Sequence, residues 1–416
     1  MSTPSHPVRI VVTDDLHRSR LTVFFRLFLA IPHYLWAVLI GSVVGVCVFA
    51  NWFILLIKGR TPDGLHSFIA GYIRYLTHLE AYFLLAANPF PAFYLIGDAA
   101  YPVDLEIDPP QPQNRWKTGF RLFLAIPALM IASALLFGGS RGGSYFSGGL
   151  AFGVAFLVWW VAMVRSRAPR GMRDLLVYCL GYAAQVSAYV FLITDRYPFA
   201  SPSTFVSRPE PAALTTAAEP TAEPAHPVSM SVDDDLRRSR LLVLFRLPVV
   251  IPHIVWLVLW SLVAIVTAIL TWACAIVIGR APRPFHRFLS RFVRYATHVY
   301  AFALMVGNPF PGFVGKPGTY PIDLELPAPE PQRRLVTAFR VFLAIPALLI
   351  SGGLGGALFV AAFLGWFVGL FLGRMPAGLR DLGAFSLRYS AQVNSYLYFL
   401  TEAYPYSGPS PDPSSP

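Results

Sequence analysis

The sequence predicts a mainly α-helical integral membrane protein made of four repeats, with pseudo-two-fold symmetry between its halves. Hydrophobic residues make up 55% of the 416 residues and charged residues only 13%, whereas soluble globular chains carry about 25% charged residues. A second observation is that one series of motifs recurs four times along the chain. We expect each repeat to contain a short strand, an apolar helical hairpin and an amphipathic interfacial helix.

The repeats set the expected domain boundaries. We place repeat 1 at residues 1–95, repeat 2 at 96–200, repeat 3 at 226–315 and repeat 4 at 316–406. Residues 201–225 are rich in Pro, Ala, Glu, Ser and Thr, which predicts a disordered linker, and residues 407–416 form a similar tail. The first and third repeats share motifs, as do the second and fourth, so duplication of a pair of repeats explains the symmetry.

Each repeat opens with a proline followed by alternating apolar and polar residues. The pattern is HPVRIVV from His6 and YPVDLEI from Tyr101, and it recurs from His226 and Tyr320. Such alternation predicts a short, half-buried strand. The four strands could pair into one small sheet.

A long apolar stretch follows the strand in every repeat. From Leu241 to Ile278 the only charged side chain is Arg246, and a single helix over this stretch would be about 57 Å long. The hydrocarbon core of a bilayer is about 30 Å thick, so we expect a hairpin. Glycine-rich segments mark its turn, between Phe137 and Leu150 and at Gly352–Gly356. The alternative is a shallow wedge in one leaflet.

Basic residues gather at the ends of these apolar stretches, and the formal net charge is +11. In the first repeat they are Arg18, Arg20, Lys58 and Arg60. The positive-inside rule then predicts a multi-pass protein whose hairpin ends, strands and both termini are cytoplasmic. Anionic lipid headgroups are the expected partners, with a protein at the cytoplasmic face as a second possibility. We expect no nucleic acid partner.

The last part of each repeat is an aromatic-rich amphipathic segment. The segment at residues 65–87 contains Arg74, His78 and Glu80, so it is too polar to span a bilayer. We expect it to lie in the interface, with Tyr and Phe at the headgroup level. Asp14 precedes the basic start of the long apolar stretch, where a carboxylate caps free N–H groups.

One arginine recurs inside the apolar stretch of every repeat. The four are Arg26, Arg121, Arg246 and Arg340. A charged residue within a membrane segment is a functional candidate, because its insertion costs about 2.5–3.5 kcal/mol. The expected roles are binding of anionic headgroups or ion pairing with carboxylates of the even strands, namely Asp104, Glu106, Asp323 and Glu325. The alternative is that each arginine extends to the nearby headgroups.

Four histidines occur in matched pairs in the odd repeats. They are His33, His78, His253 and His298, whereas the even repeats carry Ala128, Ala347, Gln185 and Gln392 at these positions. Imidazole is a ligand for zinc or copper, but no carboxylate or thiolate lies at ligand spacing. We therefore favour hydrogen-bonded histidines over a metal site and expect no cofactor. The sequence contains no GxSxG motif, Walker loop, HExxH motif or dinucleotide-binding glycine fingerprint.

These motifs together resemble a bacterial membrane family called domain of unknown function 4389. The resemblance rests on the [YH]P-[VI] strand, the FR-x-x-x-x-IP segment, the GR-x-P turn and the terminal TDRYP from Thr194. It covers nearly the whole chain as tandem copies, although the first and third copies end in NPFP. The resemblance implies a bacterial inner-membrane protein and no established activity.

The sequence favours a non-enzymatic membrane scaffold or interaction protein with a cytoplasmic-face platform that binds lipids or a partner. Four similar repeats distribute their distinctive residues evenly, whereas an active site gathers unlike residues in one place. A lipid or small-molecule transporter is the alternative, because internal repeats with interrupted helices occur in transporters. A third possibility is a membrane enzyme acting on lipid, for which the four histidines and Glu80 are the candidate residues.

Overall fold

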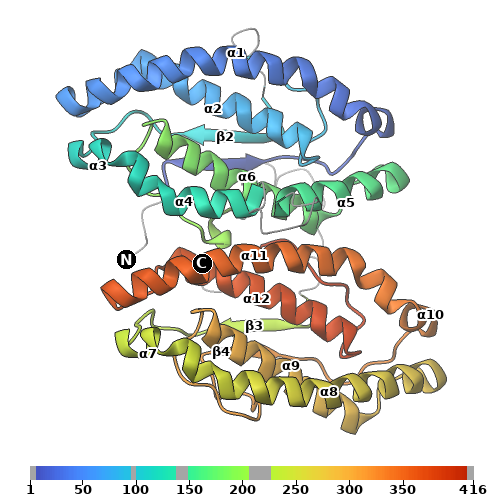
Figure 1. The fold of residues 1–416 in the computed structure, drawn as a ribbon. Helices are drawn as coiled ribbons and strands as arrows, with labels where there is room; N and C mark the ends of the chain where they lie inside the picture. Colours follow the sequence, from blue (N-terminus) through green and yellow to red (C-terminus); the bar gives the residue numbers. More distant parts are fainter. Residues whose placement is uncertain (1–5, 95–99, 137–148, 206–225, 410–416) are drawn as a thin grey trace, which may run out of the picture. The chain divides into compact units, whose positions relative to one another are not determined.

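The computed structural model describes residues 6–94, 100–136, 149–205 and 226–409. It divides into two compact units, one formed by Met1–Ala218 with Gly408–Pro416 and the other by Glu219–Ser407. Unit 1 contains the first and second repeats, and unit 2 contains the third and fourth. The same order of strand, long helix and shorter closing helix recurs in each repeat (Figure 1).

Unit 1 is mainly helical and contains one pair of strands in its described part. In chain order its elements are β1 (Val8–Val12), α1 (Arg20–Lys58), α2 (Asp63–Phe83), β2 (Val103–Ile107), α3 (Arg115–Gly119), α4 (Arg121–Leu136), α5 (Leu150–Arg165), α6 (Arg170–Val190) and the 3-10 helix η1 (Pro202–Phe205). The long helix is α1 in the first repeat and the series α3–α5 in the second.

Unit 2 has the same plan. Its elements are β3 (Ser229–Val232), α7 (Arg240–Leu244), α8 (Arg246–Ile278), α9 (Arg283–Ala303), β4 (Ile322–Glu325), α10 (Arg334–Ala338), α11 (Arg340–Leu372) and α12 (Ala377–Leu397). The closing helices of the four repeats are therefore α2, α6, α9 and α12. The pseudo-two-fold relation between the halves stays a prediction.

The predicted helical hairpin is wrong in the first, third and fourth repeats. Helices α1, α8 and α11 each run through the apolar stretch without a turn. Gly352–Gly356, predicted to form a loop, lies within α11, because a glycine costs a helix only about 1 kcal/mol. In the second repeat, residues 137–148 lie outside the described residues. Figure 1 shows α4 and α5 following one another along one direction.

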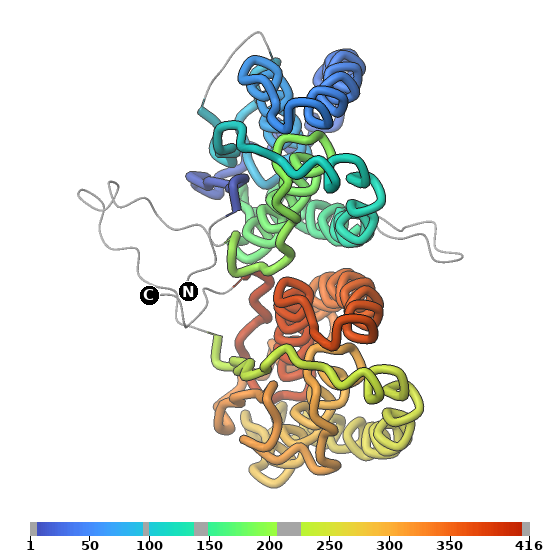
Figure 2. The backbone as a smooth tube through the Cα atoms, turned by 90° about the vertical axis from the view of Figure 1, so that its left-hand side faces the viewer, coloured from blue at the N-terminus to red at the C-terminus, as the bar shows by residue number. Residues whose placement is uncertain are grey.

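Each unit is layered. The long helices form one side, the closing helices the middle, and the strand pair the other side, as Figure 2 shows for each unit in turn. Helix α1 packs on α2, α4 and α5 pack on α6, and α2 contacts both β2 and α6. The position of the closing helices at the headgroup level stays a prediction, and the structure shows that their Tyr75, Tyr82, Tyr182 and Tyr189 are buried within the unit.

The strands pair within their own unit. β1 pairs with β2 in antiparallel register, with Val8 opposite Ile107, and β3 pairs with β4, with Ser229 opposite Glu325. In the described part of the chain the strands thus form two separate pairs and not one sheet. Each pair joins the odd and even repeats of one unit.

The ends of the two long helices in a unit are tied together. The Arg18 N–H donates to the Ser166 carbonyl at 2.9 Å, and the Gln113 N–H donates to the Gly59 carbonyl at 2.8 Å. Unit 2 repeats these bonds between Arg238 and Gly373 and between Gln332 and Gly279. The start of each long helix therefore lies beside the end of the other, which makes the pair antiparallel.

The predicted disordered linker begins with ordered structure. Residues Pro202–Phe205 form η1, and Phe205 packs against Tyr178 with ring centroids 5.5 Å apart. Gly181 allows this contact, because a Cβ there would lie 2.4 Å from the Phe205 ring. The rest of the predicted linker, residues 206–225, and most of the predicted tail, residues 410–416, lie outside the described residues.

Candidate functional site

The long helices carry the most unusual surface of the molecule. Along α1 the buried positions recur every three or four residues from Val23 to Val44 and continue at Asn51 and Leu55, which is one narrow stripe of the helix. The remaining circumference is exposed and apolar. Leu21 near one end is 70% exposed, Leu35 is 69% exposed and Ile57 near the other end is 72% exposed. The apolar surface therefore extends over the whole length of α1.

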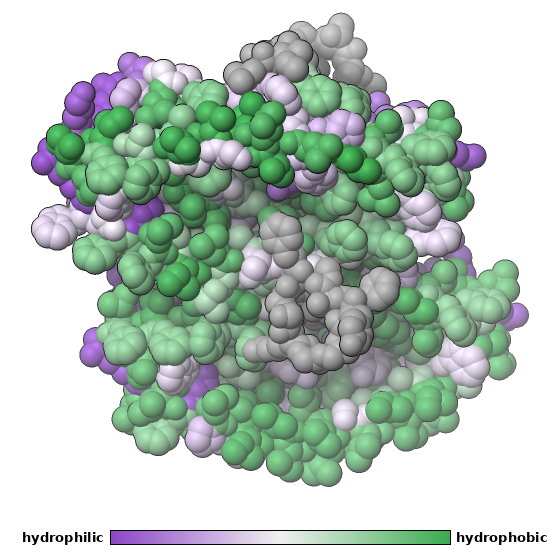
Figure 3. Space-filling model, turned by 45° about the horizontal axis from the view of Figure 1, so that its top comes forward, coloured by the Kyte–Doolittle hydropathy of each residue, from purple (hydrophilic) through white to green (hydrophobic). Residues whose placement is uncertain are grey.

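The other long helices have the same character. Exposed large side chains on α8 and α11 include Leu247, Val263, Val277, Val341 and Phe371. Figure 3 shows hydrophobic residues along the long helices and hydrophilic residues toward their ends. Helices α1, α8 and α11 are long and apolar enough to cross a membrane. Monomeric soluble proteins rarely expose apolar patches larger than a few hundred Å², so this surface indicates association with a membrane.

Basic residues lie at both ends of the apolar surface. Arg20 stands at the start of α1, and Lys58 and Arg60 stand at its end. Because the two long helices of unit 1 are antiparallel, Arg165 and Arg167 lie at the first end and Arg115 and Lys117 at the second. Each long helix of unit 1 thus has basic residues at both of its ends.

The structure does not pair the recurring arginines with the predicted carboxylates or leave them at the surface. All four are at most 2% exposed, and each donates to carbonyl groups where the closing helix ends. Arg26 donates to the carbonyls of Tyr82 and Ala87, the latter at 2.9 Å. Its guanidinium also lies 4.3 Å from the centre of the Tyr82 ring.

The other three arginines repeat this arrangement. Arg121 donates to the carbonyls of Tyr189 and Thr194, Arg246 to those of Phe302 and Gly307, and Arg340 to those of Tyr396 and Thr401. The last carbonyls of a helix have no partner within the helix and carry partial negative charge. These arginines therefore stabilise the end of the closing helix, which is a structural role.

The predicted carboxylates have other partners. Asp104 accepts bonds from Arg74 and from His78 Nε2, at 2.6 and 2.7 Å. Burial raises the pKa of Asp104, but the bonds from Arg74 and His78 outweigh it and hold this pKa well below its usual range. Glu106 is exposed and lies 3.5 Å from Arg9.

Unit 2 contains the same carboxylate cluster. Asp323 lies 3.0 Å from Arg294 and 3.2 Å from His298 Nε2. Glu325 accepts a hydrogen bond from the Ser229 hydroxyl at 2.9 Å. Each odd closing helix is thereby joined to the even strand of its unit.

The histidines have separate partners. His33 Nδ1 lies 3.0 Å from the Tyr75 hydroxyl and its ring stacks on Phe93, while His253 bonds to Tyr295 at 2.8 Å. His78 and His298 bond to aspartates instead. Among the described residues no group of three or more His, Cys, Asp and Glu side chains is placed to hold a metal ion.

One family model matches this chain four times in tandem, at residues 20–94, 144–201, 240–314 and 334–407. Its description is Domain of unknown function (DUF4389). The chain belongs to this family. No curated protein and no solved structure shows significant similarity to the chain. Three of the four matches begin at or near the start of a long helix and include its arginine, Arg26, Arg246 or Arg340. The second match begins at residue 144, after Arg121, and all four end after the closing helix of their repeat.

A second polar position of each repeat was not predicted, and Arg18 was grouped with the basic residues at the ends of the apolar stretch although the structure buries it. Eight positions before the recurring arginine stands Arg18, Gln113, Arg238 or Gln332, each buried. These side chains donate to the carbonyl of the second residue after the closing helix. The fixed spacing to the arginine was the signal that could have identified them.

The second residue after each closing helix has a left-handed backbone conformation. Leu85, Leu192, Met305 and Phe399 have φ between 62° and 67°, which is uncommon for residues other than glycine. Arg18 Nε donates to the Leu85 carbonyl at 3.1 Å, and Gln113 Nε2 donates to the Leu192 carbonyl at 2.8 Å. Asp14, predicted to be a helix cap, forms a buried ion pair with Arg18 at 2.8 Å.

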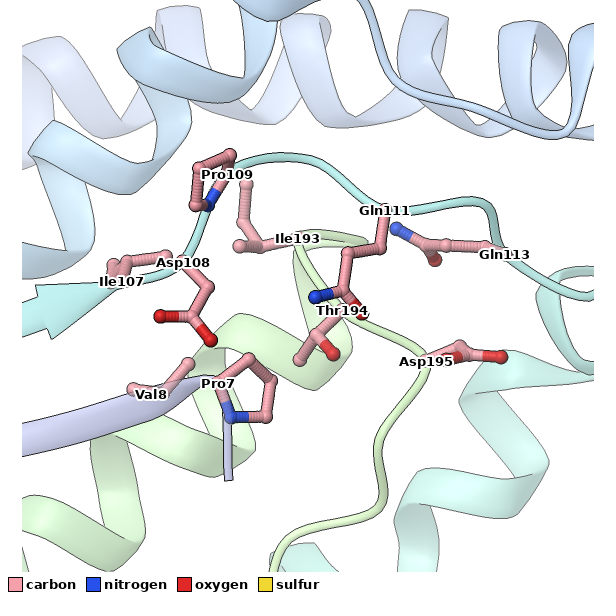
Figure 4. Close-up of a pocket in the computed structure, with 10 residues that line it drawn as sticks. All are labelled: Pro7, Val8, Ile107, Asp108, Pro109, Gln111, Gln113, Ile193, Thr194 and Asp195. Atoms are coloured by element: carbon pink, nitrogen blue, oxygen red, sulfur yellow. The ribbon is translucent and has the colours of Figure 1, made fainter. Parts of the chain in front are cut away.

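A small pocket lies on the strand side of unit 1 (Figure 4). It is bounded by the end of β2 and by the segment after α6, with Asp108, Gln111 and Thr194 among its lining residues. Its free volume is about 10 Å³, which suits about one water molecule. This pocket is too small to hold a lipid or a nucleotide.

Proposed function

We propose that this DUF4389 chain is a non-enzymatic membrane scaffold whose long helices lie within one leaflet, parallel to the bilayer plane. The closing helices and strand pairs form a platform on the cytoplasmic face of a bacterial inner membrane. That platform binds anionic lipid headgroups, and its polar surface is available to a protein partner. The described termini of both units lie on the platform side in this arrangement.

The length of the exposed apolar surface carries this proposal. α1 has 39 residues, so it is about 58 Å long, whereas the hydrocarbon core is about 30 Å thick. An upright α1 would leave exposed apolar residues such as Leu21 or Ile57 in water. A helix lying in the leaflet keeps all of them in lipid and brings both basic ends to the same headgroup layer.

Transport of a lipid or small molecule is the second candidate. It is favoured by the three helices that are long and apolar enough to cross a membrane. In that case the long helices would be steeply tilted and their two ends would lie on opposite sides of the bilayer. The orientation of α1 therefore distinguishes the two functions.

The test is a depth measurement along α1. Single spin labels replace Leu21, Leu35 and Phe49 in a background without Cys47, Cys179 and Cys274, and their accessibility to oxygen and to a water-soluble nickel complex is measured in bilayers. The labels are spaced by about 21 Å along the helix axis. We expect the three depths to agree within about 5 Å, because the helix lies parallel to the membrane.

A label at Val11 on β1, which is 38% exposed, is the matched control on the platform. It should be accessible to the nickel complex and not to oxygen dissolved in the lipid. Depths that change steadily from Leu21 to Phe49 would contradict the scaffold and favour transport. A Leu35 label that behaves like the Val11 label would contradict membrane insertion.

A further inference from the structure

The closing helices of the two odd repeats differ on one face. In α9 three arginines follow one another at intervals of four residues, Arg283, Arg287 and Arg291, and all are exposed. The corresponding residues of α2 are Asp63, Ser67 and Gly71. Residues four apart lie on the same side of a helix, so α9 carries a stripe of positive charge that α2 lacks.

The stripe has no carboxylate partner within the described residues. Other arginines of the platform are paired, such as Arg294 with Asp323 and Arg380 with Asp381. The three arginines of the stripe form no ion pair with any described residue. Their charge is therefore available to an external anion.

A neighbouring loop extends the stripe. Gly315 approaches α9 so closely that a Cβ there would lie 2.4 Å from the Arg291 carbonyl oxygen. The next residue, Lys316, is exposed and adds a fourth cation beside Arg291. Phe313 and Val314, which precede this turn, are 43% and 58% exposed. Cations and exposed apolar side chains thus lie side by side.

The same loop is attached to the long helix. Trp256 of α8 donates its indole N–H to the Phe313 carbonyl at 3.0 Å, so the loop lies where α8 meets the platform. In unit 1 the residue corresponding to Val314 is Tyr94, whose ring lies 2.9 Å from the position of a Gly71 Cβ. An arginine side chain would not fit there, so unit 1 is closed at the point where unit 2 presents Arg291.

We propose that Arg283, Arg287, Arg291 and Lys316 form a binding site for the phosphate groups of anionic lipids, which makes unit 2 the charge-selective half of the protein. The site rests on the proposed function, because headgroups reach it only when α8 lies in the membrane. The exposed Phe313 and Val314 favour a lipid surface over a soluble acidic partner, since apolar side chains beside cations enter the headgroup layer.

The test compares two equivalent positions with two lipids. Ala70 on α2 and Ser290 on α9 are half-buried residues at matching places, and each is replaced by cysteine and labelled with a small fluorophore in a cysteine-free chain. The chain is placed in phosphatidylcholine bilayers that contain a nitroxide quencher on phosphatidylglycerol or on phosphatidylcholine. We expect the anionic quencher to be at least about twofold more effective at Ser290, and the two to be equal at Ala70.

In a triple variant, R283Q/R287Q/R291Q, the ratio of quenching by labelled phosphatidylglycerol to quenching by labelled phosphatidylcholine at Ser290 should fall to the ratio at Ala70. Quenching by labelled phosphatidylcholine should stay unchanged. Loss of the preference in added inorganic phosphate, but not in chloride of equal ionic strength, would show that the site recognises the phosphate group of the lipid. A preference that remains unchanged in the triple variant would overturn the proposal. Equal quenching by both lipids at Ser290 would overturn it in favour of a soluble acidic partner. No quenching at either position would instead contradict the membrane scaffold itself.

Discussion

The odd and even repeats meet one structural requirement with different side chains. Every closing helix ends in a left-handed residue whose carbonyl points into the protein and needs a donor. The odd repeats supply a guanidinium from Arg18 or Arg238, and the even repeats supply a neutral amide from Gln113 or Gln332. The requirement is therefore for a buried donor and not for a charge.

The guanidinium donor of the odd repeats needs a counterion. Asp14 pairs with Arg18, and both side chains are at most 1% exposed. Asp234 pairs with Arg238 in unit 2, again with almost no exposure. An amide has no such need, so the odd repeats should be more sensitive than the even repeats to loss of a single polar group.

The largest effect should come from removing the counterion. Asp14→Ala leaves the buried Arg18 charge without its paired carboxylate, and we expect a loss of about 3–5 kcal/mol in the free energy of unfolding. Gln113→Ala leaves the neutral Leu192 carbonyl without its donor and removes one acceptor from Arg121, which keeps its two carbonyl partners. This variant should cost about 1–3 kcal/mol. Equilibrium unfolding in detergent micelles, followed by tryptophan fluorescence, measures both. Equal losses would mean that the odd and even ends are energetically alike.

The recurring arginine provides a comparison in which the repeats should agree. Arg26→Lys and Arg121→Lys keep the charge but lose the planar guanidinium. In each arginine Nη1 donates to two carbonyls, and Nη2 donates to a side-chain oxygen of Asn88 or Gln113. We expect each variant to lose about 2 kcal/mol, because hydrogen bonds from charged groups contribute about 1.5–3 kcal/mol. The same unfolding assay applies. A loss in only one of the two variants would show that the arginine has different roles in odd and even repeats.

Replacing the charged donor and its counterion by a neutral amide should have a smaller effect. The double variant Asp14→Asn with Arg18→Gln gives the first repeat the amide of an even repeat. Replacing a buried ion pair by neutral groups of similar size is often nearly neutral, so we expect a loss below about 1.5 kcal/mol. The comparison with Asp14→Ala isolates the cost of the uncompensated charge. If the free energy of unfolding falls as much as in Asp14→Ala, the guanidinium and amide donors are not interchangeable.

Local patterns in the sequence predicted part of this fold. The repeats are carried by short motifs, such as the arginine at Arg26 and the turn at Gly59, that recur at fixed spacing, so they are visible without a structure. The hairpin was wrongly predicted because the length of the apolar stretch was compared with the bilayer thickness, which assumes an upright helix. The bilayer thickness does not limit the length of a helix that lies parallel to the membrane, as proposed for α1.

The candidate site was predicted less well because its contacts join distant residues. Arg26 was identified, but its carbonyl partners lie on both sides of Leu85, and no sequence pattern indicated that Leu85 would adopt a left-handed conformation. Asp104 was identified too, yet His78, its partner, lies 26 residues away on another element. Residue type selected the right side chains, and only the packing of strand on helix showed which of them meet.

The smallest effect concerns the histidine that distinguishes an odd closing helix from an even one. Burial lowers the pKa of His298, although Asp323 opposes this shift. The unfolded chain therefore binds a proton near pH 6.5 that the folded chain does not, so stability falls as the pH is lowered through that range. His298→Gln copies Gln392 of the even repeat and removes this proton. We expect the variant to lose less stability between pH 7 and pH 5 than the parent chain. The difference corresponds to the uptake of at most one proton on unfolding.

Asp323 provides the control for this prediction. Its pKa is lowered in the folded chain, so the stability that it contributes is lost at a lower pH, and this loss remains in the variant. An unchanged slope above pH 5 would show that His298 does not cause the difference between odd and even repeats in their response to acid.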